Sequence, residues 1–386
     1  MIVLTHLGQY WSARHREVRL LGCNEVRIDG GRNQGVAYDV TDGGMMLPRF
    51  RRRFREEQAG ADWDLVRWTY QSLPTPMVEM AEMVEAAGNR TVAGWGINFL
   101  SLAARRSKPV DLASLDVPAD LETDHLLAPI IPRRALAFGV TYLNSALERE
   151  AEGEHGDYGY VYRSVKDRAE RPELFLKGTS PEHFVGPNGR MGLRWDSTNS
   201  LDRAGMPVDR VVVGAGIEPE LAAVVSSNGR IWGYTLANDV SGNRIENESL
   251  LYLTQAKLFT GCLVLGPLIL LSEEEGNPRL DLSARVLRED GSVVFEKSST
   301  TARLNAPLST LIGWAKSHLV IHPGEVFSTG TDMVPDGEAK VLRPGMRVEI
   351  ECPAIGVLRH GAAEVPEPGA EGPALNPDYS QWEFER

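Results

Sequence analysis

The sequence predicts an α+β protein rich in β-strand, in which a small mixed N-terminal region precedes a larger strand-rich region. Three observations favour this class. The first 125 residues mix strand and helix patterns, the later strand-like segments follow one another with short turns, and we find no internal repeat. A chain of 386 residues is long enough for a large β-rich domain beside a smaller one.

The N-terminal region, residues 1–125, carries two short strand patterns and one helix pattern. Residues 25–29 and 35–40 read as strands with a glycine-rich turn between them, and residues 77–87 have apolar side chains at helical spacing. The methionines of this helix indicate core packing rather than cofactor binding. The basic, aromatic run 49–55 precedes two glutamates, so we interpret it as a solvated helix face or an oligomer contact.

Four prolines spaced along residues 106–134 predict an extended linker, because proline disfavours helix. We therefore place an N-terminal domain at residues 1–125, the main domain at 126–364 and an extended tail at 365–386.

The main domain should begin with a strand over 135–142 and a helix over 144–152, which Asn144 or Ser145 would cap. A second helix is expected over 247–260. Further strands are expected over 264–271, 280–287, 292–296, 325–329 and 347–351. The polar segment 152–159 could form a lid.

The stretch 216–239 predicts a β-hairpin that brings three acids together. Asn228-Gly229 is typical of a two-residue turn between apolar strands. That turn places Glu218 opposite Asp239 and Glu220 opposite Ala237. Side chains two apart on a strand share a face, so the three carboxylates should project from one side of the hairpin. A β-bulge would break this register.

Three converging carboxylates indicate a site for a hard divalent cation. Like charges this close repel one another, and Mg²⁺ prefers oxygen ligands while keeping positions open for substrate. Mn²⁺ is the alternative ion. The competing interpretations are that one or more of the acids faces solvent, or that one is protonated through a raised pKa.

Composition excludes several other classes. A net charge of −12 argues against a general nucleic-acid binder. Three widely spaced cysteines, Cys23, Cys262 and Cys352, form neither a disulfide framework nor a zinc motif. No apolar run approaches a membrane span or a secretory signal, so we expect a soluble, cytoplasmic protein without a membrane partner.

Other catalytic motifs fail on their context. The segment 211–216 suggests a dinucleotide-binding glycine loop, but it lacks the third glycine and a strand pattern follows where a helix should begin. No Gly-x-Ser-x-Gly elbow occurs, and the eight histidines show no metal-ligand spacing. Two lysines remain of interest. Lys177 and Lys257 would ordinarily be surface residues, but beside a metal-carboxylate site either could anchor a substrate carboxylate or transfer a proton.

From about residue 134 to residue 359 the chain resembles the fumarylacetoacetate hydrolase family, and most closely its 2-keto-3-deoxy sugar acid dehydratase branch. The segments that carry the resemblance, in family order, are Gly139-Val-Thr-Tyr, Phe175-Leu-Lys-Gly-Thr, Glu218-Pro-Glu-Leu-Ala-Ala-Val-Val, Gly233-Tyr-Thr-Leu-Ala-Asn-Asp-Val-Ser, Leu251-Tyr-Leu-Thr-Gln-Ala-Lys-Leu-Phe-Thr-Gly and Ser328-Thr-Gly-Thr. The N-terminal region matches only weakly.

The resemblance implies a mixed β-roll as the catalytic core and a homo-dimer or homo-tetramer. It also implies a Mg²⁺ site and a pocket for a small 2-keto acid. The implied metal ligands are Glu218, Glu220 and Asp239, and the implied pocket residues are Ser145, Lys177, Lys257 and Thr331.

One departure from the family pattern distinguishes its branches. Hydrolytic members carry a histidine and, three residues later, a glutamate that together activate water. Here Ser145 stands in the histidine position and Glu148 is kept. Without the imidazole, hydrolysis of a C–C bond is disfavoured. We therefore expect Mg²⁺-dependent dehydration of a 2-keto-3-deoxy aldonic acid, with Glu148 as base and Lys257 as acid or substrate anchor. Two alternatives stay open: a Mg²⁺-dependent hydrolase or decarboxylase of a β-keto or diketo acid, and a non-catalytic binding protein.

Overall fold

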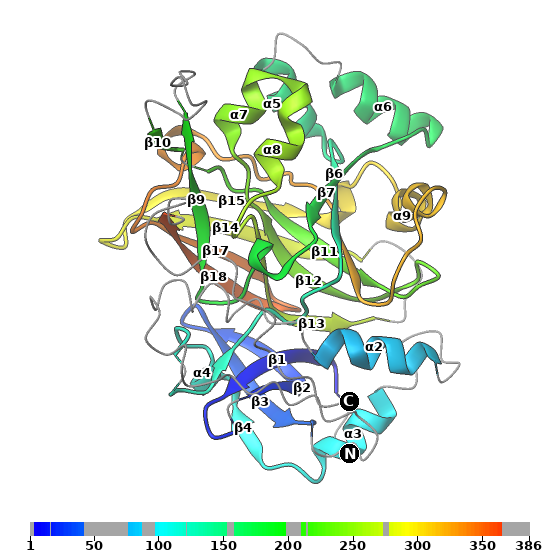
Figure 1. Cartoon of the computed structure of the whole chain (residues 1–386), viewed down its shortest axis with the longest axis vertical. Coiled ribbons are helices and arrows are strands. Elements are labelled where there is room, and N and C mark those ends of the chain that lie inside the picture. The colour runs from blue at the N-terminus through cyan, green and yellow to red at the C-terminus, as the bar shows by residue number, and fades with distance from the viewer. Residues whose placement is uncertain are drawn as a thin grey trace, which may run out of the picture.

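Two mixed β-sheets form the frame of the molecule (Figure 1). The computed structural model describes residues 4–15, 17–41, 76–86, 97–120, 122–152, 158–197, 210–213, 215–272 and 278–364. Strands predominate among these residues, and both sheets contain parallel as well as antiparallel strand pairs. The predicted strand-rich α+β class is confirmed. No helix in these ranges has both the length and the apolar character needed to cross a bilayer.

The larger, 12-stranded sheet has the order β4-β3-β2-β1-β13-β12-β11-β16-β6-β7, with β5 beside β1 and β8 beside β13. Its strands are β1 (His6–Ser12), β2 (Glu17–Asp29), β3 (Arg32–Asp39), β4 (Pro109–Asp111), β5 (His125–Leu126), β6 (Ala135–Gly139), β7 (Glu173–Gly178), β8 (Phe184–Val185), β11 (Pro219–Val225), β12 (Ile231–Asp239), β13 (Leu263–Leu271) and β16 (Glu325–Ser328).

The second, 6-stranded sheet has the order β10-β9-β18-β17-β14-β15. Its strands are β9 (Arg190–Ser197), β10 (Arg210–Val213), β14 (Asp281–Leu287), β15 (Val293–Thr300), β17 (Arg347–Cys352) and β18 (Gly356–Glu364).

Helices lie around the two sheets (Figure 1). They are α2 (Pro76–Ala86), α3 (Ile97–Ala104), α4 (Leu112–Leu115), α5 (Leu143–Glu152), α6 (Tyr158–Arg168), α7 (Asn243–Glu248), α8 (Leu253–Lys257) and α9 (Leu308–Lys316). Short 3₁₀ turns are η3 (Pro181–His183), η4 (Leu250–Tyr252), η5 (Thr301–Arg303) and η6 (Gly337–Lys340).

The N-terminal strands extend the same sheet that carries the acids. His6 of β1 pairs with Leu270 of β13, and β13 in turn pairs with β12. The prediction of an extended linker over 106–134 is wrong, because β4 and β5 join the sheet and Ile130 and Ile131 are buried in the core. Proline there restricts the backbone without removing the segment from the core. The division into domains at residue 125 stays a prediction.

Most of the predicted elements are present with small boundary shifts. The helix expected at 77–87 is α2, and its Met77 and Met80 are buried as predicted. The single helix expected over 247–260 is wrong, because the chain there forms α7, η4 and α8 in succession. Strands β1, β9 and β18 and helix α9 were not predicted. The basic run 49–55, residues 153–157 of the suggested lid and the tail 365–386 lie outside the described residues.

The predicted hairpin is β11–β12, but its turn differs from the expected two-residue turn. Ser226 N–H donates to Arg230 O and Gly229 N–H donates to Ser226 O, so three residues, 227–229, form the loop. One extra residue, Trp232, then interrupts the pairing between β11 and β12. This bulge offsets the longer loop, and Glu220 faces Ala237 as predicted.

The hairpin is buried on both faces, which explains why its acids lie inside the protein. On one face Leu221, Ala223 and Leu236 pack in a core that also includes Val286 and Val348 of the second sheet. On the opposite face, Ala222, Val224 and Ala237 pack with residues of β1, α2 and β13. The carboxylates stand where this apolar double layer ends.

Gly229 provides a test of the hairpin turn. Its φ of +78° is left-handed, so Gly229→Ala should lower the unfolding free energy by about 1–2 kcal/mol. The matched change Gly313→Ala, at an exposed position inside α9 with open space for a Cβ atom, should raise it by about 0.5–1 kcal/mol. Chemical denaturation followed by circular dichroism measures both. Shifts of the same sign would contradict the turn geometry.

Candidate metal centre and active-site cavity

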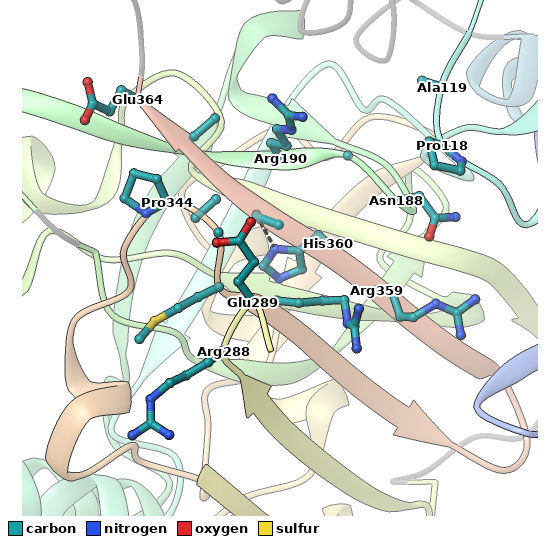
Figure 2. A pocket seen from close by; sticks show the side chains of 17 residues that line it. Pro118, Ala119, Asn188, Arg190, Arg288, Glu289, Pro344, Arg359, His360 and Glu364 are labelled. Atoms are coloured by element: carbon teal, nitrogen blue, oxygen red, sulfur yellow. Dashed lines mark hydrogen bonds between the residues drawn. The ribbon is translucent and has the colours of Figure 1, made fainter. Parts of the chain in front are cut away.

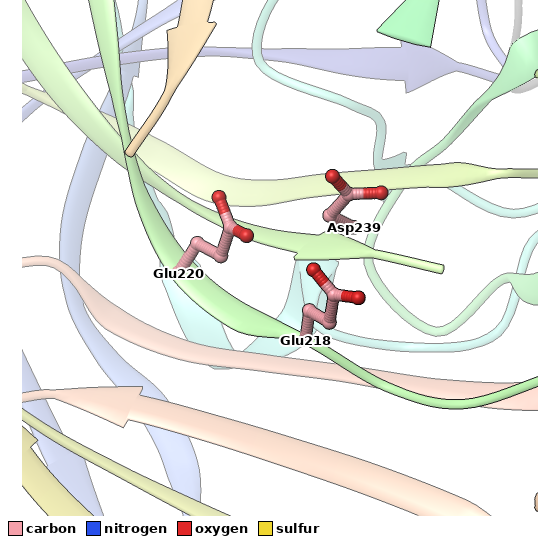
Figure 3. A group of neighbouring side chains, drawn as sticks. All are labelled: Glu218, Glu220 and Asp239. Atoms are coloured by element: carbon pink, nitrogen blue, oxygen red, sulfur yellow. The ribbon is translucent and has the colours of Figure 1, made fainter. Parts of the chain in front are cut away.

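Three carboxylates converge at the open end of the hairpin (Figure 3). Glu218 directly precedes β11, Glu220 is the second residue of β11, and Asp239 ends β12. Asp239 N–H donates to Glu218 O at 3.0 Å, which continues the predicted register by one pair. One carboxylate oxygen from each residue lies within 4.8 Å of the others. The structure therefore brings together the three predicted metal ligands.

The carboxylate of Glu220 is held by the turn that follows β16. Its Oε2 accepts hydrogen bonds from Ser328 Oγ and, at 2.8 Å, from Gly330 N–H. Burial raises the pKa of Glu220 well above its ordinary value, and the charges of Asp239 and Glu218 raise it further. The predicted Ser-Thr-Gly-Thr turn thus supports a metal ligand directly.

The carboxylate of Asp239 is fully buried beside a lysine. Lys177 Nζ lies 2.6 Å from Asp239 Oδ1, and both side chains are inaccessible to solvent. Burial raises the pKa of Asp239, although Lys177 and Lys257 oppose the shift. Neither oxygen of Asp239 accepts a geometrically good hydrogen bond from the described residues. Such buried, unsatisfied oxygens suit coordination of a cation.

Lys257, at the end of α8, contacts the third acid. Its Nζ donates to Glu218 Oε1 at 2.6 Å and to Ser241 Oγ at 2.5 Å, while Ser241 Oγ donates to Glu218 Oε1 at 2.9 Å. Glu246 Oε1 lies 3.7 Å from the same ammonium nitrogen. Lys257 also stands 5.2 Å from the ring centroid of Phe175. Lys257 therefore contacts two acids, Glu218 and Glu246, and an aromatic ring at the same time.

The donor set fits a hard divalent cation. Two ammonium groups, Lys177 and Lys257, face four carboxylates, those of Glu218, Glu220, Asp239 and Glu246. An excess of negative charge in a buried place is unfavourable without a further cation, and burial itself raises the pKa of both Glu220 and Asp239. Carboxylate oxygens at this separation are the ligands that Mg²⁺ and Mn²⁺ prefer.

A cavity of about 390 Å³ opens beside Glu218, the one acid of the cluster that lines it. Four of the predicted site residues line it: Ser145, Glu218, Lys257 and Thr331. The remaining wall is mostly apolar, with a few polar groups, and consists of Phe138, Gly139, Val140, Val161, Arg171, Pro172, Glu173, Phe175, Glu246, Ser249, Leu253 and Gly330. A mostly apolar pocket with convergent polar groups is the usual form of a small-molecule site.

Two predicted residues are placed differently from the rest. Lys177 is not on the cavity wall, because its ammonium group contacts Asp239 and donates to Val240 O at 2.6 Å and Lys257 O at 2.7 Å. Its ammonium group contacts the predicted metal ligand Asp239, and its predicted role in substrate binding stays a prediction. The side chain of Glu148 lies outside the described residues, although its position belongs to α5, one turn after Ser145.

Sequence reasoning missed several residues of the site. Ser241 follows β12 directly and Glu246 belongs to α7, and neither was among the predicted site residues. Glu173 and Phe175 stand two apart on β7 and both line the cavity. Strand alternation from the quoted Phe175 could have found Glu173.

A larger cavity of about 750 Å³ shares no lining residue with the first (Figure 2). Two of its arginines are balanced by acids, since Arg288 pairs with Glu338 and Arg359 pairs with Asp116. None of the predicted site residues lines it.

His360 connects this larger cavity to the hairpin. Its Nε2 accepts from Asn238 Nδ2 at 2.9 Å, and its Nδ1 faces Gly361 O at 3.0 Å, the hydrogen bond drawn in Figure 2. Asn238 Oδ1 accepts from Glu218 N–H at 2.9 Å. A neutral His360 therefore fixes the amide that positions the backbone of Glu218.

The fold and the carboxylate site together define a strand-rich protein with a divalent-metal centre beneath a small-molecule cavity. Residues 163–362 match the family model of the fumarylacetoacetate (FAA) hydrolase C-terminal domain. The chain belongs to this family, and the predicted resemblance is confirmed.

Two curated relatives are close enough to compare over most of their length. A 2-dehydro-3-deoxy-D-arabinonate dehydratase of Saccharolobus solfataricus is 35% identical over 252 residues, which is 64% of this chain and 78% of the relative. A probable 2-keto-3-deoxyxylonate dehydratase of Haloferax volcanii is 33% identical over 268 residues, which is 68% of this chain and 85% of the relative.

Solved structures show the same fold. A 2-keto-3-deoxy-D-arabinonate dehydratase complexed with magnesium and 2,5-dioxopentanoate aligns with a TM-score of 0.61 and 23% identity, over 94% of this chain and 100% of that chain.

His360 should make the stability of the protein depend on pH. Burial lowers the pKa of His360 from 6.5 to about 4. The unfolded chain therefore binds this proton at a higher pH than the folded protein does. Stability from this group is fully present above pH 6.5 and decreases as the pH falls toward 4, by about 3 kcal/mol in total.

The measurement is the unfolding free energy of wild type minus that of His360→Gln between pH 4 and 7.5. This difference should decrease as the pH falls through the window. His318→Gln, which changes an exposed histidine, is the control. A pH-independent difference for His360→Gln would show that the imidazole titrates alike in both states.

Proposed function

We propose that the protein dehydrates a 2-keto-3-deoxy aldonic acid, and specifically converts a 2-keto-3-deoxy-pentonate to 2,5-dioxopentanoate. The observation that carries the proposal is the cavity wall, on which Ser145, Lys257 and Thr331 meet the metal-ligand residue Glu218. The two curated relatives are named as dehydratases of such acids, which supports the reaction class. Ser145 stands where hydrolytic members of the family carry the histidine that helps to activate water, which supports elimination over hydrolysis.

Glu218, Glu220 and Asp239 would hold Mg²⁺, with Mn²⁺ as the alternative ion. When bound, the ion supplies Lewis acidity toward the 2-keto acid end of the substrate, which acidifies the C3 protons and stabilises an enolate. Lys177 contributes by fixing Asp239. Ser328 and Gly330 contribute by fixing Glu220.

The remaining residues would bind the substrate and move its protons. Lys257 stands on the cavity wall beside Glu218, where its ammonium group can donate a proton to the departing C4 hydroxyl. Ser145 and Thr331 would bind the substrate. Thr331 Oγ1 donates to Pro219 O at 2.7 Å, so its position is fixed before substrate arrives. Glu148 is our candidate for the base that removes the C3 proton.

The alternative is a Mg²⁺-dependent hydrolase or decarboxylase in which Glu148 and the metal hold water without a histidine. The wall of the cavity offers no histidine among the described residues to activate that water. A homo-dimer or homo-tetramer and a cytoplasmic location stay predictions.

A substrate panel tests the reaction. Purified protein should release water from a 2-keto-3-deoxy-pentonate in the presence of Mg²⁺, and 2,5-dioxopentanoate should accumulate. EDTA should abolish turnover, and added Mg²⁺ should restore it. Fragments from C–C cleavage, or CO₂, would support the alternative instead. Absence of turnover on every 2-keto-3-deoxy acid, despite bound metal, would identify a non-catalytic binding protein.

Glu148→Gln tests the base. Turnover should fall by about 10²- to 10⁴-fold, because a positioned base contributes this much. Mg²⁺ affinity, measured by calorimetry, should remain close to that of wild type. Glu150→Gln is the matched control, since positions two apart on a helix do not face the same way. Full activity of Glu148→Gln would rule out the assignment.

A further inference from the structure

Arg171 is a cation on the cavity wall that the reaction proposed above does not use. Within the described residues the wall carries two cationic side chains, Arg171 and Lys257. Lys257 is already engaged, because it contacts the carboxylates of Glu218 and Glu246. Arg171 is exposed, and no acid in the part of the chain that the structure describes lies within ion-pair distance of it. Its charge therefore remains for a ligand.

An aromatic ring holds the guanidinium group of Arg171 in place. The guanidinium carbon lies 4.9 Å from the ring centroid of Trp314 in α9. The indole N–H of Trp314 donates to Ala169 O at 3.2 Å, so the ring is tied to the segment just before Arg171. Stacking engages the face of a guanidinium group, whereas its N–H donors lie in the plane. A stacked arginine therefore keeps these donors directed outward, toward an anion.

Arg171 stands at the end of the cavity that is remote from the metal ligands. Phe175 of β7 marks the near end, because Lys257 Nζ lies 5.2 Å from its ring centroid and donates to Glu218. Arg171 precedes Pro172, and a residue before proline is held extended, so the chain at Arg171 continues the direction of β7. Arg171 and Phe175 both line the cavity, and four residues of extended chain span about 13 Å.

The size of the cavity leaves room beyond a five-carbon acid. Its volume of about 390 Å³ falls in the range of pockets that accept drug-sized ligands, which are larger than such an acid. With its 2-keto acid end at the metal ligands, a pentonate ends in the C5 hydroxyl. A longer acid extends further toward Arg171. The ligand group that matches the planar fork of a guanidinium best is a second carboxylate, which it binds with two parallel hydrogen bonds.

We propose that Arg171 binds a carboxylate at the far end of the substrate, so that the site also accepts a six-carbon dicarboxylic acid, 2-keto-3-deoxy-hexarate. The proposal rests on the dehydration proposed above. The C3–H and C4–O bonds break, the C4 hydroxyl leaves as water with the C3 proton, and a C3–C4 double bond forms. Transfer of the C5 proton to C3, and of the C5 hydroxyl proton to C4, then gives 2,5-dioxohexanedioate. No oxidant or reductant is consumed.

Two unreactive acids test the carboxylate site independently of dehydration. 2-Oxoadipate and 2-oxohexanoate share the 2-keto acid end and the chain length, but only 2-oxoadipate ends in a carboxylate, and neither carries a hydroxyl that could leave. In calorimetry with Mg²⁺, wild type should bind 2-oxoadipate about 10- to 100-fold more tightly than 2-oxohexanoate, as expected for hydrogen bonds between charged groups. Arg171→Met, which removes the charge but keeps an unbranched side chain, should abolish this preference.

Arg168→Met is the matched control. Arg168 also stacks on an aromatic ring, with its guanidinium carbon 5.4 Å from the centroid of Tyr160, but it pairs with Glu170 and does not line the cavity. This variant should keep the wild-type preference. Arg171→Lys keeps the charge without the planar fork and should keep only part of the preference. Equal affinity of wild type for the two acids, or an unchanged preference in Arg171→Met, overturns the proposal.

Turnover distinguishes a failure of this proposal from a failure of the dehydration. Wild type should release water from 2-keto-3-deoxy-hexarate, and Arg171→Met should lower kcat/KM for this acid, relative to that for the pentonate, by about 10- to 100-fold. Turnover of the pentonate without turnover of the hexarate by wild type overturns the proposal. If wild type dehydrates neither acid but prefers 2-oxoadipate, the dehydration fails, whereas the carboxylate site at Arg171 is supported.

Discussion

The burial of an acidic cluster at the end of a hydrophobic hairpin is the constraint on which the site depends. Asp239 is fully buried, and the lysine that contacts it, Lys177, is equally buried. Breaking a buried ion pair by removal of one partner leaves an uncompensated charge, which typically costs about 3–5 kcal/mol. Lys177 also bonds to Val240 O and Lys257 O, so one side chain ties together β7, the end of β12 and the end of α8. Lys177 therefore helps to position both Asp239, a predicted metal ligand, and Lys257, which lines the cavity.

The sequence was sufficient to predict that the three acids converge. It was not sufficient to predict which residues hold them in place. Alternation and an Asn-Gly turn predicted that Glu218, Glu220 and Asp239 converge, and two deviations from the ideal hairpin cancelled, so that the register at the acids survived. The role of Lys177 could not be predicted in this way, because its partners lie 62 to 80 residues away, and local pattern carries no information about such contacts. The linker prediction failed for a related reason. Proline indicates an extended backbone, but burial of Ile130 and Ile131 is decided by tertiary packing.

The cavity brings charged groups beside the metal-ligand residue Glu218 together with a mostly apolar wall. On one side the carboxylates of Glu218 and Glu246 lie beside the buried ammonium group of Lys257, where electrostatic interactions are strong. Strand β7 and the residues before it add Arg171, Glu173 and Phe175 to the wall. The chain leaves β6 at the cavity wall through Val140, whose φ of +56° is unusual for a β-branched residue. Such a backbone conformation persists only where the surroundings impose it, and here it leads from the sheet into the helix that carries Ser145 and Glu148.

The pairing of β1 with β13 also bears on how the protein is made. His6 finds its partner, Leu270, only after most of the chain has left the ribosome. Until then the edge of β1 that pairs with β13 lacks this partner, and an unpaired strand edge is prone to association with other chains. Asp239 lies on β12, the next strand beyond β13, so the sheet around the metal ligands closes late in synthesis. Contacts this distant in sequence slow folding, whereas the β11–β12 pairing that brings the three acids together is local.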